Sequence, residues 1–448
     1  MKNTIKVSII MPVLNGMPYF PDALESVVSQ TLPDIEVIVV DAGSTDGTIE
    51  YIKEQKEKND NIMLCFSEKK STGYQYNIGL SKAVGEYVGF VESDDYVPAT
   101  MYELLYNSAI RNEKPDYVKG DIIDFAEIDI EKYELYVKTF YHNKELYGKV
   151  INKLPFKEII YRDVNHWSGI YRRDFLTNNK IVFNETLGAA AQDAGFVSQT
   201  LLLAKSRMYL SNAFYHYRQD NPGSSMKSSK RLFFTLQEYI FLLELLSTQQ
   251  YDNIDGVSVV ADRYFYGFMY NYVRNTIFDK YLEELLDEFT KLLKSYYIKH
   301  KSSLDTSEQM GHFLENRKSF FEDILSKYKR DKQRYEQVVK KILSSSQLLI
   351  FGAGELGEGT YVCLKYNGYK GEIAFCDNRI HGERIHGCDI LSVEEASLKW
   401  KDACFIITNS KHYDNMKAQL LSLGVSENDI VYFEGVWGHS SFKDLSFF

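Results

Sequence analysis

The chain has 448 residues, of which 44% are hydrophobic and 25% are charged, and its formal net charge is −10. This length predicts two to four domains at about 100–200 residues each, with the composition of a globular protein. The acidic balance argues against a general nucleic-acid-binding protein, which needs a basic surface.

Strand and helix patterns alternate over the first 120 residues or so. Apolar, β-branched runs predict buried strands at residues 7–12, 36–40, 62–66 and 87–91. Apolar residues at helical spacing predict helices at 21–30 and 77–84. Ser44 or Asp46 is expected to cap a further helix that carries Ile49 and Ile52. The alternation predicts an α/β fold, a parallel sheet with helices on both faces.

Acidic residues follow two of these strands. Asp41 ends the second strand, and Glu92, Ser93, Asp94 and Asp95 follow the fourth. Because the carboxyl ends of parallel strands form the ligand-binding edge, both groups should point into one crevice. Carboxylates there can hold Mn²⁺ or Mg²⁺, which neutralises the charge on a diphosphate leaving group. The alternative is that the acidic run only forms a turn.

The middle of the chain changes character. A loop leads into a helix near Gln192 and Asp193, and long helical patterns fill residues 231–345. The run RLFFTLQEYIFLLELL is apolar nearly all round and is expected to be buried. The tyrosine-rich run DRYFYGFMYNYVR suits either an interface or buried helix packing.

A second α/β unit begins at Gln347. A strand runs into a glycine-rich turn, and an aspartate ends the next strand about 20 residues on, the pattern of a dinucleotide-binding fingerprint. The residues of this second nucleotide site would be Gly352, Gly354, Gly357 and Asp377. The unit is about half a full dinucleotide-binding domain, so a nucleotide-binding, regulatory or assembly role is favoured over a second enzyme.

The five cysteines form no CxxC pair, which favours reduced thiols over a metal cluster. They are Cys65, Cys363, Cys376, Cys388 and Cys404. The first residues, MKNTIKVSIIMPVLNG, do not have the pattern of a signal peptide, and no run of about 18 apolar residues predicts a transmembrane helix. These features predict a cytoplasmic protein. They leave open association with the inner face of a membrane and the formation of a homo-oligomer.

Five segments in chain order resemble glycosyltransferase family 2, which has the GT-A fold. They are VSIIMPVLNG, SVVSQTLPDIEVIVVDAGSTDGT, SKAVGEYVGFVESDDYVP, YRRDFLTNNKIVFNETLGAAAQD and YHYRQDNPGSS, within about residues 6–225. The resemblance implies an inverting, metal-dependent hexosyl- or N-acetylhexosaminyltransferase. Its donor would be a nucleotide sugar, with UDP as the expected nucleotide. Its acceptor would be a glycan or lipid-linked glycan in bacterial surface polysaccharide or glycoconjugate synthesis. The C-terminal unit resembles Rossmann-like accessory domains of bacterial polysaccharide enzymes.

The resemblance also implies roles for matching residues. Asp193 would be the base that takes the proton of the acceptor hydroxyl, and Asp94 and Asp95 would ligate the metal. The nucleotide sugar would contact Pro12, Val13, Asn15, Asp41, Ala42, Asn77, Glu92, Ser93, Asp94, Trp167, His216 and Arg218. Two of these have structural alternatives: Trp167 as a core residue, and His216 as a hydrogen-bonded histidine at a strand edge.

The chain departs from the family pattern at three positions. Ala42 stands where a second acidic residue is usual, which puts uracil selectivity in question. Gln192 stands before Asp193 where a glutamate is frequent, and Tyr76 stands where an arginine is common.

The sequence therefore predicts three parts. These are a GT-A domain at residues 1–230, a helical region at 231–345 and a Rossmann-like domain at 346–448. Two other functions stay open: an NAD(P)-dependent oxidoreductase centred on the C-terminal glycine turn, and an inactive nucleotide-binding scaffold. The donor sugar, the acceptor and the linkage are not determined at this level.

Overall fold

The computed structural model describes residues 4–128, 131–138, 140, 144–153, 156–160, 162–224, 230–248, 254–275, 277–366 and 368–433. The chain divides into two compact units, Met1–Phe321 and Glu322–Phe448. The boundaries expected at residues 230 and 345 remain a prediction, because compactness does not tell whether the helical part folds on its own.

A nine-stranded sheet forms the centre of the first unit, in the order β3-β2-β1-β4-β8-β5-β9-β7, with β6 paired to β5. Its strands are β1 (Val7–Val13), β2 (Ile35–Asp41), β3 (Ile62–Phe66), β4 (Tyr87–Phe90), β5 (Tyr117–Ile128), β6 (Glu131–Lys138), β7 (Val150–Ile151), β8 (Gly169–Arg172) and β9 (Arg207–Arg218). The pairs β1–β2, β2–β3 and β1–β4 are parallel, as the alternating pattern predicts. Between β4 and β5, β8 runs antiparallel to both, and so brings β9 into the same sheet.

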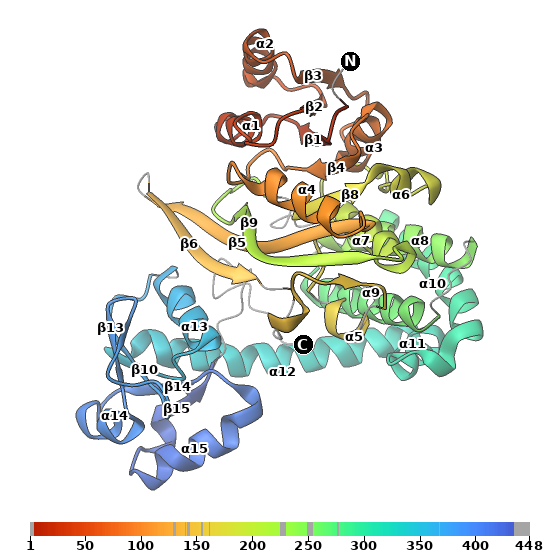
Figure 1. Cartoon of the computed structure of the whole chain (residues 1–448). Coiled ribbons are helices and arrows are strands. Elements are labelled where there is room, and N and C mark those ends of the chain that lie inside the picture. Colours follow the sequence, from red (N-terminus) through yellow and green to blue (C-terminus); the bar gives the residue numbers. More distant parts are fainter. Residues whose placement is uncertain are drawn as a thin grey trace. The chain divides into compact units, whose positions relative to one another are not determined.

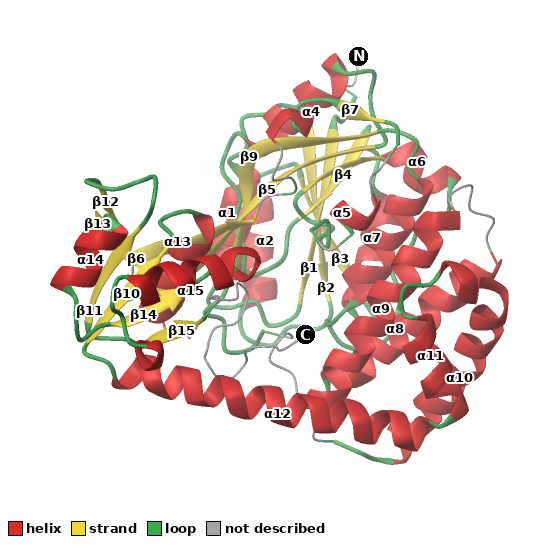
Figure 2. Ribbon diagram, turned by 90° about the horizontal axis from the view of Figure 1, so that it is seen from below, coloured by secondary structure: helices red, strands yellow, loops and turns green. Residues whose placement is uncertain are grey.

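The helices of the first unit are given in two groups by their order in the chain. The helices before residue 180 are α1 (Phe20–Val28), α2 (Thr48–Lys58), α3 (Thr72–Lys82), α4 (Met101–Arg111), α5 (Phe156–Ile159) and α6 (Arg173–Asn178). The later helices are α7 (Gln192–Leu203), α8 (Arg231–Thr248), α9 (Ile254–Arg274), α10 (Lys280–His300) and α11 (Ser307–Glu315). In Figure 1, α1 and α2 lie on one side of β1–β3 and α3 on the other. Figure 2 shows α7 to α11 gathered together beside the sheet.

Two helix starts differ from the sequence-based expectation. The N-cap of α2 is Gly47, not Ser44 or Asp46, and its backbone has φ of +96°. Asp46 still accepts a hydrogen bond from the Thr48 amide at 3.2 Å. Helix α3 begins at Thr72 rather than residue 77, because the Ser71 hydroxyl accepts a hydrogen bond from the Tyr74 amide and caps it.

An aromatic cluster fills the space between β4, α3 and α7. Phe90 is fully buried, and its ring centroid lies 5.3 Å from Tyr76, 5.1 Å from His166 and 5.4 Å from Phe196. Phe183 stacks on Phe196 at 4.2 Å. Tyr76, at the position where an arginine is common in the resembled family, is therefore a core residue here, 1% exposed.

Helices α8 to α11 of the predicted helical region belong to the first unit. Helix α8 packs against α7, α9 and α10, and its largely apolar sequence is buried as expected, with Leu236, Tyr239 and Leu243 fully covered. The tyrosine-rich helix α9 also buries Phe265 and Phe268 completely. Among the helices that the structure describes, none combines the length and the apolar character needed to cross a membrane.

The second unit contains a six-stranded sheet in the order β12-β13-β11-β10-β14-β15. Helix α12 (Arg317–Ser344) contains the boundary between the two units. The elements that follow are β10 (Gln347–Phe351), α13 (Glu355–Tyr366), β11 (Glu372–Cys376), β12 (Arg384–Ile385), β13 (Cys388–Leu391), α14 (Val393–Lys399), β14 (Cys404–Ile407), α15 (Tyr413–Ser422) and β15 (Ile430–Tyr432). The parallel strands β13-β11-β10-β14-β15 stand in the 3-2-1-4-5 order of a doubly wound sheet. No disulfide joins the five cysteines, all of which lie in the described part of the chain.

We expect Phe90→Ala to lower the free energy of unfolding of the first unit by about 3–5 kcal/mol, the usual cost of emptying a buried phenylalanine site. Phe66→Ala is the matched control, because Phe66 is 60% exposed at the end of β3. Urea or thermal unfolding of the full chain measures both. Equal effects of the two substitutions would contradict the assignment of Phe90 to the core.

Candidate functional site

The carboxyl ends of β1 and β2 form the first wall of the candidate site. The Ala42 amide donates to the Val13 carbonyl at 3.0 Å, which continues the pairing of the two strands. Asn15 has φ of +52°, and its side-chain oxygen accepts from the Thr45 amide at 2.8 Å. Pro12 is buried at the end of β1 beside these groups. The predicted base-pocket residues of β1 and β2 are thus brought together.

Asp41 holds the loop that follows β2. It is fully buried, and its carboxylate accepts hydrogen bonds from the amides of Gly43 at 2.7 Å and Ser44 at 2.9 Å and from the Ser44 hydroxyl. Ser44 in turn accepts from the Asn15 amide at 2.8 Å and so joins the two loops. In this structure Asp41 shapes the pocket wall through these contacts.

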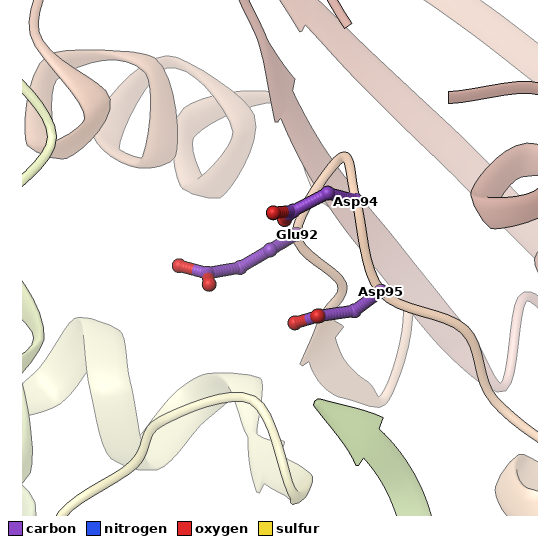
Figure 3. A group of neighbouring side chains, drawn as sticks. All are labelled: Glu92, Asp94 and Asp95. Atoms are coloured by element: carbon purple, nitrogen blue, oxygen red, sulfur yellow. The ribbon is translucent and has the colours of Figure 1, made fainter. Parts of the chain in front are cut away.

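Three carboxylates converge on the loop after β4. Glu92, Asp94 and Asp95 each offer an oxygen within 4.8 Å of the others, and their side chains point to the same side of the loop (Figure 3). Asp95 is 1% exposed, and its Oδ2 is buried without a hydrogen-bond partner. An all-oxygen, anionic donor set with an unsatisfied buried oxygen fits a hard divalent cation such as Mg²⁺ or Mn²⁺.

The end of β9 fixes this loop. The Arg218 amide donates to Asp95 Oδ1 at 2.8 Å, and its Nε donates to the Asp94 carbonyl at 2.9 Å. Asn221 donates to Asp94 Oδ2 at 2.7 Å, and the Tyr215 hydroxyl accepts from the Glu92 amide at 2.9 Å. These contacts cross more than 120 positions of sequence. The loop is therefore held in shape from outside by another strand.

Burial raises the pKa values of these carboxylates, and crowding adds to the shift for Glu92 and Asp95. Burial, followed by the charges of Asp94 and Asp193, raises the pKa of Glu92 to about 8. Burial and the neighbouring charges of Asp94 and Glu92 raise the pKa of Asp95, and burial raises that of Asp94. Like charges close together disfavour ionisation of one another, and a bound cation would relieve this repulsion.

Asp193 lies in the first turn of α7. Its charge contributes to the raised pKa of Glu92, so the two carboxylates lie near each other. Burial raises the pKa of Asp193, while the charges of Arg263 and Arg231 oppose that shift. A carboxylate with a raised pKa at the positive end of a helix dipole can accept a proton from a hydroxyl group.

The turn that presents Asp193 is strained and held by several contacts. Ala191 has φ of +69°, a left-handed conformation that is costly for a residue with a Cβ atom. Gln192 donates to the Thr186 carbonyl at 2.6 Å. Asn77 on α3 donates to the Phe183 carbonyl at 2.9 Å and accepts from the Phe183 amide at 3.0 Å. Asn77 thus anchors the segment that leads to Asp193.

Glu238, on α8, is the main site residue that the sequence pattern missed. It is 1% exposed, and its Oε1 accepts from the Gly195 amide at 2.7 Å, which satisfies a free amide in the first turn of α7. Its Oε2 accepts from Asn184 at 2.9 Å. A Cβ atom at Gly195 would lie 2.2 Å from Glu238 Oε1, so the glycine allows this approach. The sequence signal that could have indicated this residue is a glutamate within a largely apolar helical run that was expected to be buried.

Three further predicted site residues are well buried. Trp167 is 3% exposed and stacks on Tyr215 at 3.9 Å and Tyr217 at 5.3 Å, as its core alternative expects. His216 stacks on Tyr96 at 4.3 Å, with Nε2 3.7 Å from Glu134. The Arg218 guanidinium lies 4.4 Å from the Tyr19 ring centroid. Contacts of all three with a nucleotide sugar remain predictions.

In the second unit, the residues of the predicted nucleotide site lie in and beside a single turn after β10. Gly352 has φ of +112°, and a Cβ atom at Gly357 would lie 1.8 Å from the Gly352 carbonyl oxygen, so both positions need glycine. A Cβ atom at Gly354 would meet nothing within 4 Å. Asp377 Oδ2 accepts from the Ala353 amide at 3.0 Å, and Oδ1 accepts from the Arg379 amide at 2.8 Å. The carboxylate is thus engaged in tying the turn to the end of β11.

Comparison with known proteins defines the class. Residues 8–170 match the family model of glycosyl transferase family 2. The fold of the chain resembles the crystal structure of TarS 1–349 from Staphylococcus aureus, with a TM-score of 0.56 at 19% identity over 73% of this chain and 92% of that one. Residues 8–170 are therefore a glycosyltransferase family 2 domain, in a fold of the GT-A type.

Its curated relatives are bacterial glycosyltransferases. GlyG of Streptococcus pneumoniae is 29% identical over 50% of this chain and 73% of the relative, and GlyA of the same organism is 27% identical over 48% and 30%. The poly(ribitol-phosphate) β-N-acetylglucosaminyltransferase TarS of Staphylococcus aureus is 30% identical over 50% and 37%. The chain thus spans about three quarters of GlyG but only about a third of GlyA and TarS.

We expect Glu238→Gln to change how stability depends on pH. Burial raises the pKa of Glu238 from 4.5 to about 8, so the folded protein keeps a proton that the unfolded chain loses. The stability of the wild type therefore falls as pH rises between these values, and the glutamine variant lacks this contribution. Melting temperatures from about pH 5 to about pH 9 should show the variant gaining on the wild type.

Glu244→Gln, an exposed change on the same helix, is the control and should run parallel to the wild type. The titrations of Glu92 and Asp95 are common to all three proteins and cancel in the comparison. Parallel curves for Glu238→Gln and the wild type would contradict the buried carboxyl.

Proposed function

We propose that this chain is an inverting, metal-dependent glycosyltransferase that moves a sugar from a UDP-sugar donor to a hydroxyl acceptor. The observation that carries the proposal is the acidic loop at the end of β4, together with Asp193, whose charge acts on Glu92. The family 2 domain and the GT-A fold support the transferase chemistry.

The metal site would consist of Asp95 and Asp94, with Glu92 beside them. A divalent cation bound there supplies Lewis acidity, which neutralises the negative charge that develops on the nucleoside diphosphate. Asp95 Oδ2, buried and unpartnered, is the oxygen best prepared for such a ligand role. The backbone and guanidinium of Arg218 then keep the loop in place while the donor enters and leaves.

Asp193 would be the general base of the transfer. Its carboxylate takes the proton of the acceptor hydroxyl while the hydroxyl oxygen forms a bond to the anomeric carbon. The bond between that carbon and the diphosphate oxygen breaks on the opposite face, which inverts the configuration. Glu238 and the strained turn at Ala191 act through position, because they fix the first turn of α7.

UDP is the nucleotide that the comparisons favour. A crystal structure of TarS 1–349 in complex with UDP-GlcNAc resembles this chain with a TM-score of 0.58 at 19% identity. We infer that the acceptor is a glycan or lipid-linked glycan of a bacterial surface polymer, since the curated relatives include the TarS enzyme that glycosylates poly(ribitol-phosphate). Work on such an acceptor would place the protein at the inner face of the membrane. The C-terminal unit would serve as a nucleotide-binding, regulatory or assembly domain.

Asp193→Asn should preserve UDP binding. It should lower the rate of sugar transfer, or the slow rate of donor hydrolysis without acceptor, by about 100- to 10,000-fold, because the base is lost. The assay is release of nucleoside diphosphate from a panel of nucleotide sugars. Asp174→Asn, a change at a side chain 65% exposed on α6, is the control. Normal turnover by Asp193→Asn would sink the assignment of the base.

Metal binding can be measured separately from sugar transfer. We expect Asp95→Asn to weaken Mn²⁺ binding about tenfold or more, because one of three anionic ligands is lost. Titration of the protein with Mn²⁺, followed by the electron paramagnetic resonance of free Mn²⁺, measures this without an acceptor. Asp60→Asn, at an exposed acid before β3, is the control. EDTA should abolish UDP release by the wild type, and EDTA-resistant release would remove the metal from the mechanism.

A further inference from the structure

Arg263, on α9, is a partly buried arginine. Its Nη1 atom is buried and donates no hydrogen bond to a described neighbour, although a guanidinium has five N–H groups to place. Lys119, a fully buried basic side chain of the same unit, is by contrast paired with Asp163 at 2.5 Å. An unsatisfied buried donor is costly, and more so when it is charged, so Arg263 is prepared for an anion that binds from outside.

The helix places Arg263 next to the proposed base. Helix α9 packs on α7, and the Ser198 hydroxyl of α7 lies 3.2 Å from the hydroxyl of Tyr264, the neighbour of Arg263. Among the neighbouring charges that lower the pKa of Asp193, that of Arg263 has the larger effect, and that of Arg231, at the start of α8, has the smaller. Both arginines therefore lie close enough to Asp193 for their charges to act on it.

Open space continues along the same face of α9. Arg263, Gly267, Tyr270 and Arg274 follow one another at steps of four, three and four residues, which puts them on one helix face. A Cβ atom at Gly267 would meet nothing within 4 Å. The Arg274 guanidinium lies 4.3 Å from the Tyr270 ring centroid, and both act electrostatically on Arg231. We call this face, with Arg231, the arginine slot.

We propose that the arginine slot binds a phosphate group of the acceptor substrate and so selects phosphate-bearing acceptors. The inference rests on the proposed transferase function, because it takes the space beside Asp193 as the acceptor side. Guanidinium groups bind phosphate oxygens through paired, charge-assisted hydrogen bonds, which would satisfy the donors of Arg263. The phosphate could belong to a monoester or to a phosphodiester polymer, since both present the same oxygens.

The test is calorimetric titration of the full-length protein, kept saturated with Mg²⁺ and UDP so that the donor site is occupied. The probes are glycerol 3-phosphate for a monoester, glycerophosphoglycerol for a phosphodiester, and glycerol as the neutral control. We expect the wild type to bind one or both phosphate probes and not glycerol. The better probe tells the two sources apart.

Two variants remove the slot in different ways. Arg263→Gln removes the charge, and Gly267→Leu fills the open space, and each should weaken phosphate binding about tenfold or more. Arg111→Gln, at an exposed arginine on α4, is the control and should bind like the wild type. Arg263→Lys, which keeps the charge but loses the fork of donors, should fall between the wild type and Arg263→Gln.

Three results would overturn the proposal. One is a wild type that binds neither phosphate probe. Another is that Arg263→Gln and Gly267→Leu both bind phosphate as the wild type does, while Arg263→Gln changes only the pH profile of donor turnover. The guanidinium would then act on Asp193 alone. The third is a loss of UDP affinity in Arg263→Gln, which would place the side chain at the donor. A wild type that does not bind UDP would count against the transferase function instead, and phosphate titration without nucleotide would still decide the slot.

Discussion

The attachment of the acidic loop to the end of β9 is the constraint on which the site depends. Three carboxylates within 4.8 Å repel one another, and a short loop would move them apart if nothing held it. The amide and Nε of Arg218, the Asn221 side chain and the Tyr215 hydroxyl hold each acidic residue of the loop or its backbone. The site is thereby arranged before any cation or donor arrives.

This attachment explains the mixed sheet. The parallel strands β1 to β4 alone would leave the loop after β4 unsupported on one side. Strand β8 runs antiparallel beside β4 and joins it to β5, which pairs with β9. An isolated β-bridge between Tyr96 and His216 also connects the segment after the acidic loop to β9. The long strand β9 is therefore a functional support as well as a sheet element.

Helices α8 and α9 have a comparable role around Asp193. Glu238 of α8 bonds to the first turn of α7, and Arg263 of α9 contributes charge next to Asp193. A buried carboxyl group and a buried, unpaired guanidinium nitrogen are costly in a packed helix bundle, so their presence there points to a purpose beyond packing. The helices thus complete the site, which the strand-end motifs build only in part.

The sequence by itself determined the parallel core, the positions of the acidic loop and of Asp193 at element ends, and the family to which residues 8–170 belong. These follow from local patterns: β-branched runs, strand-end acids and motifs a few residues long. Only the tertiary structure decided that Asp41 serves its own loop, that Tyr76 lies in an aromatic core, that Glu238 bonds to the first turn of α7, and that the charge of Arg263 acts on Asp193. Those outcomes depend on contacts between residues far apart in the chain, and the energy of such contacts is set by packing and burial, which no local pattern records.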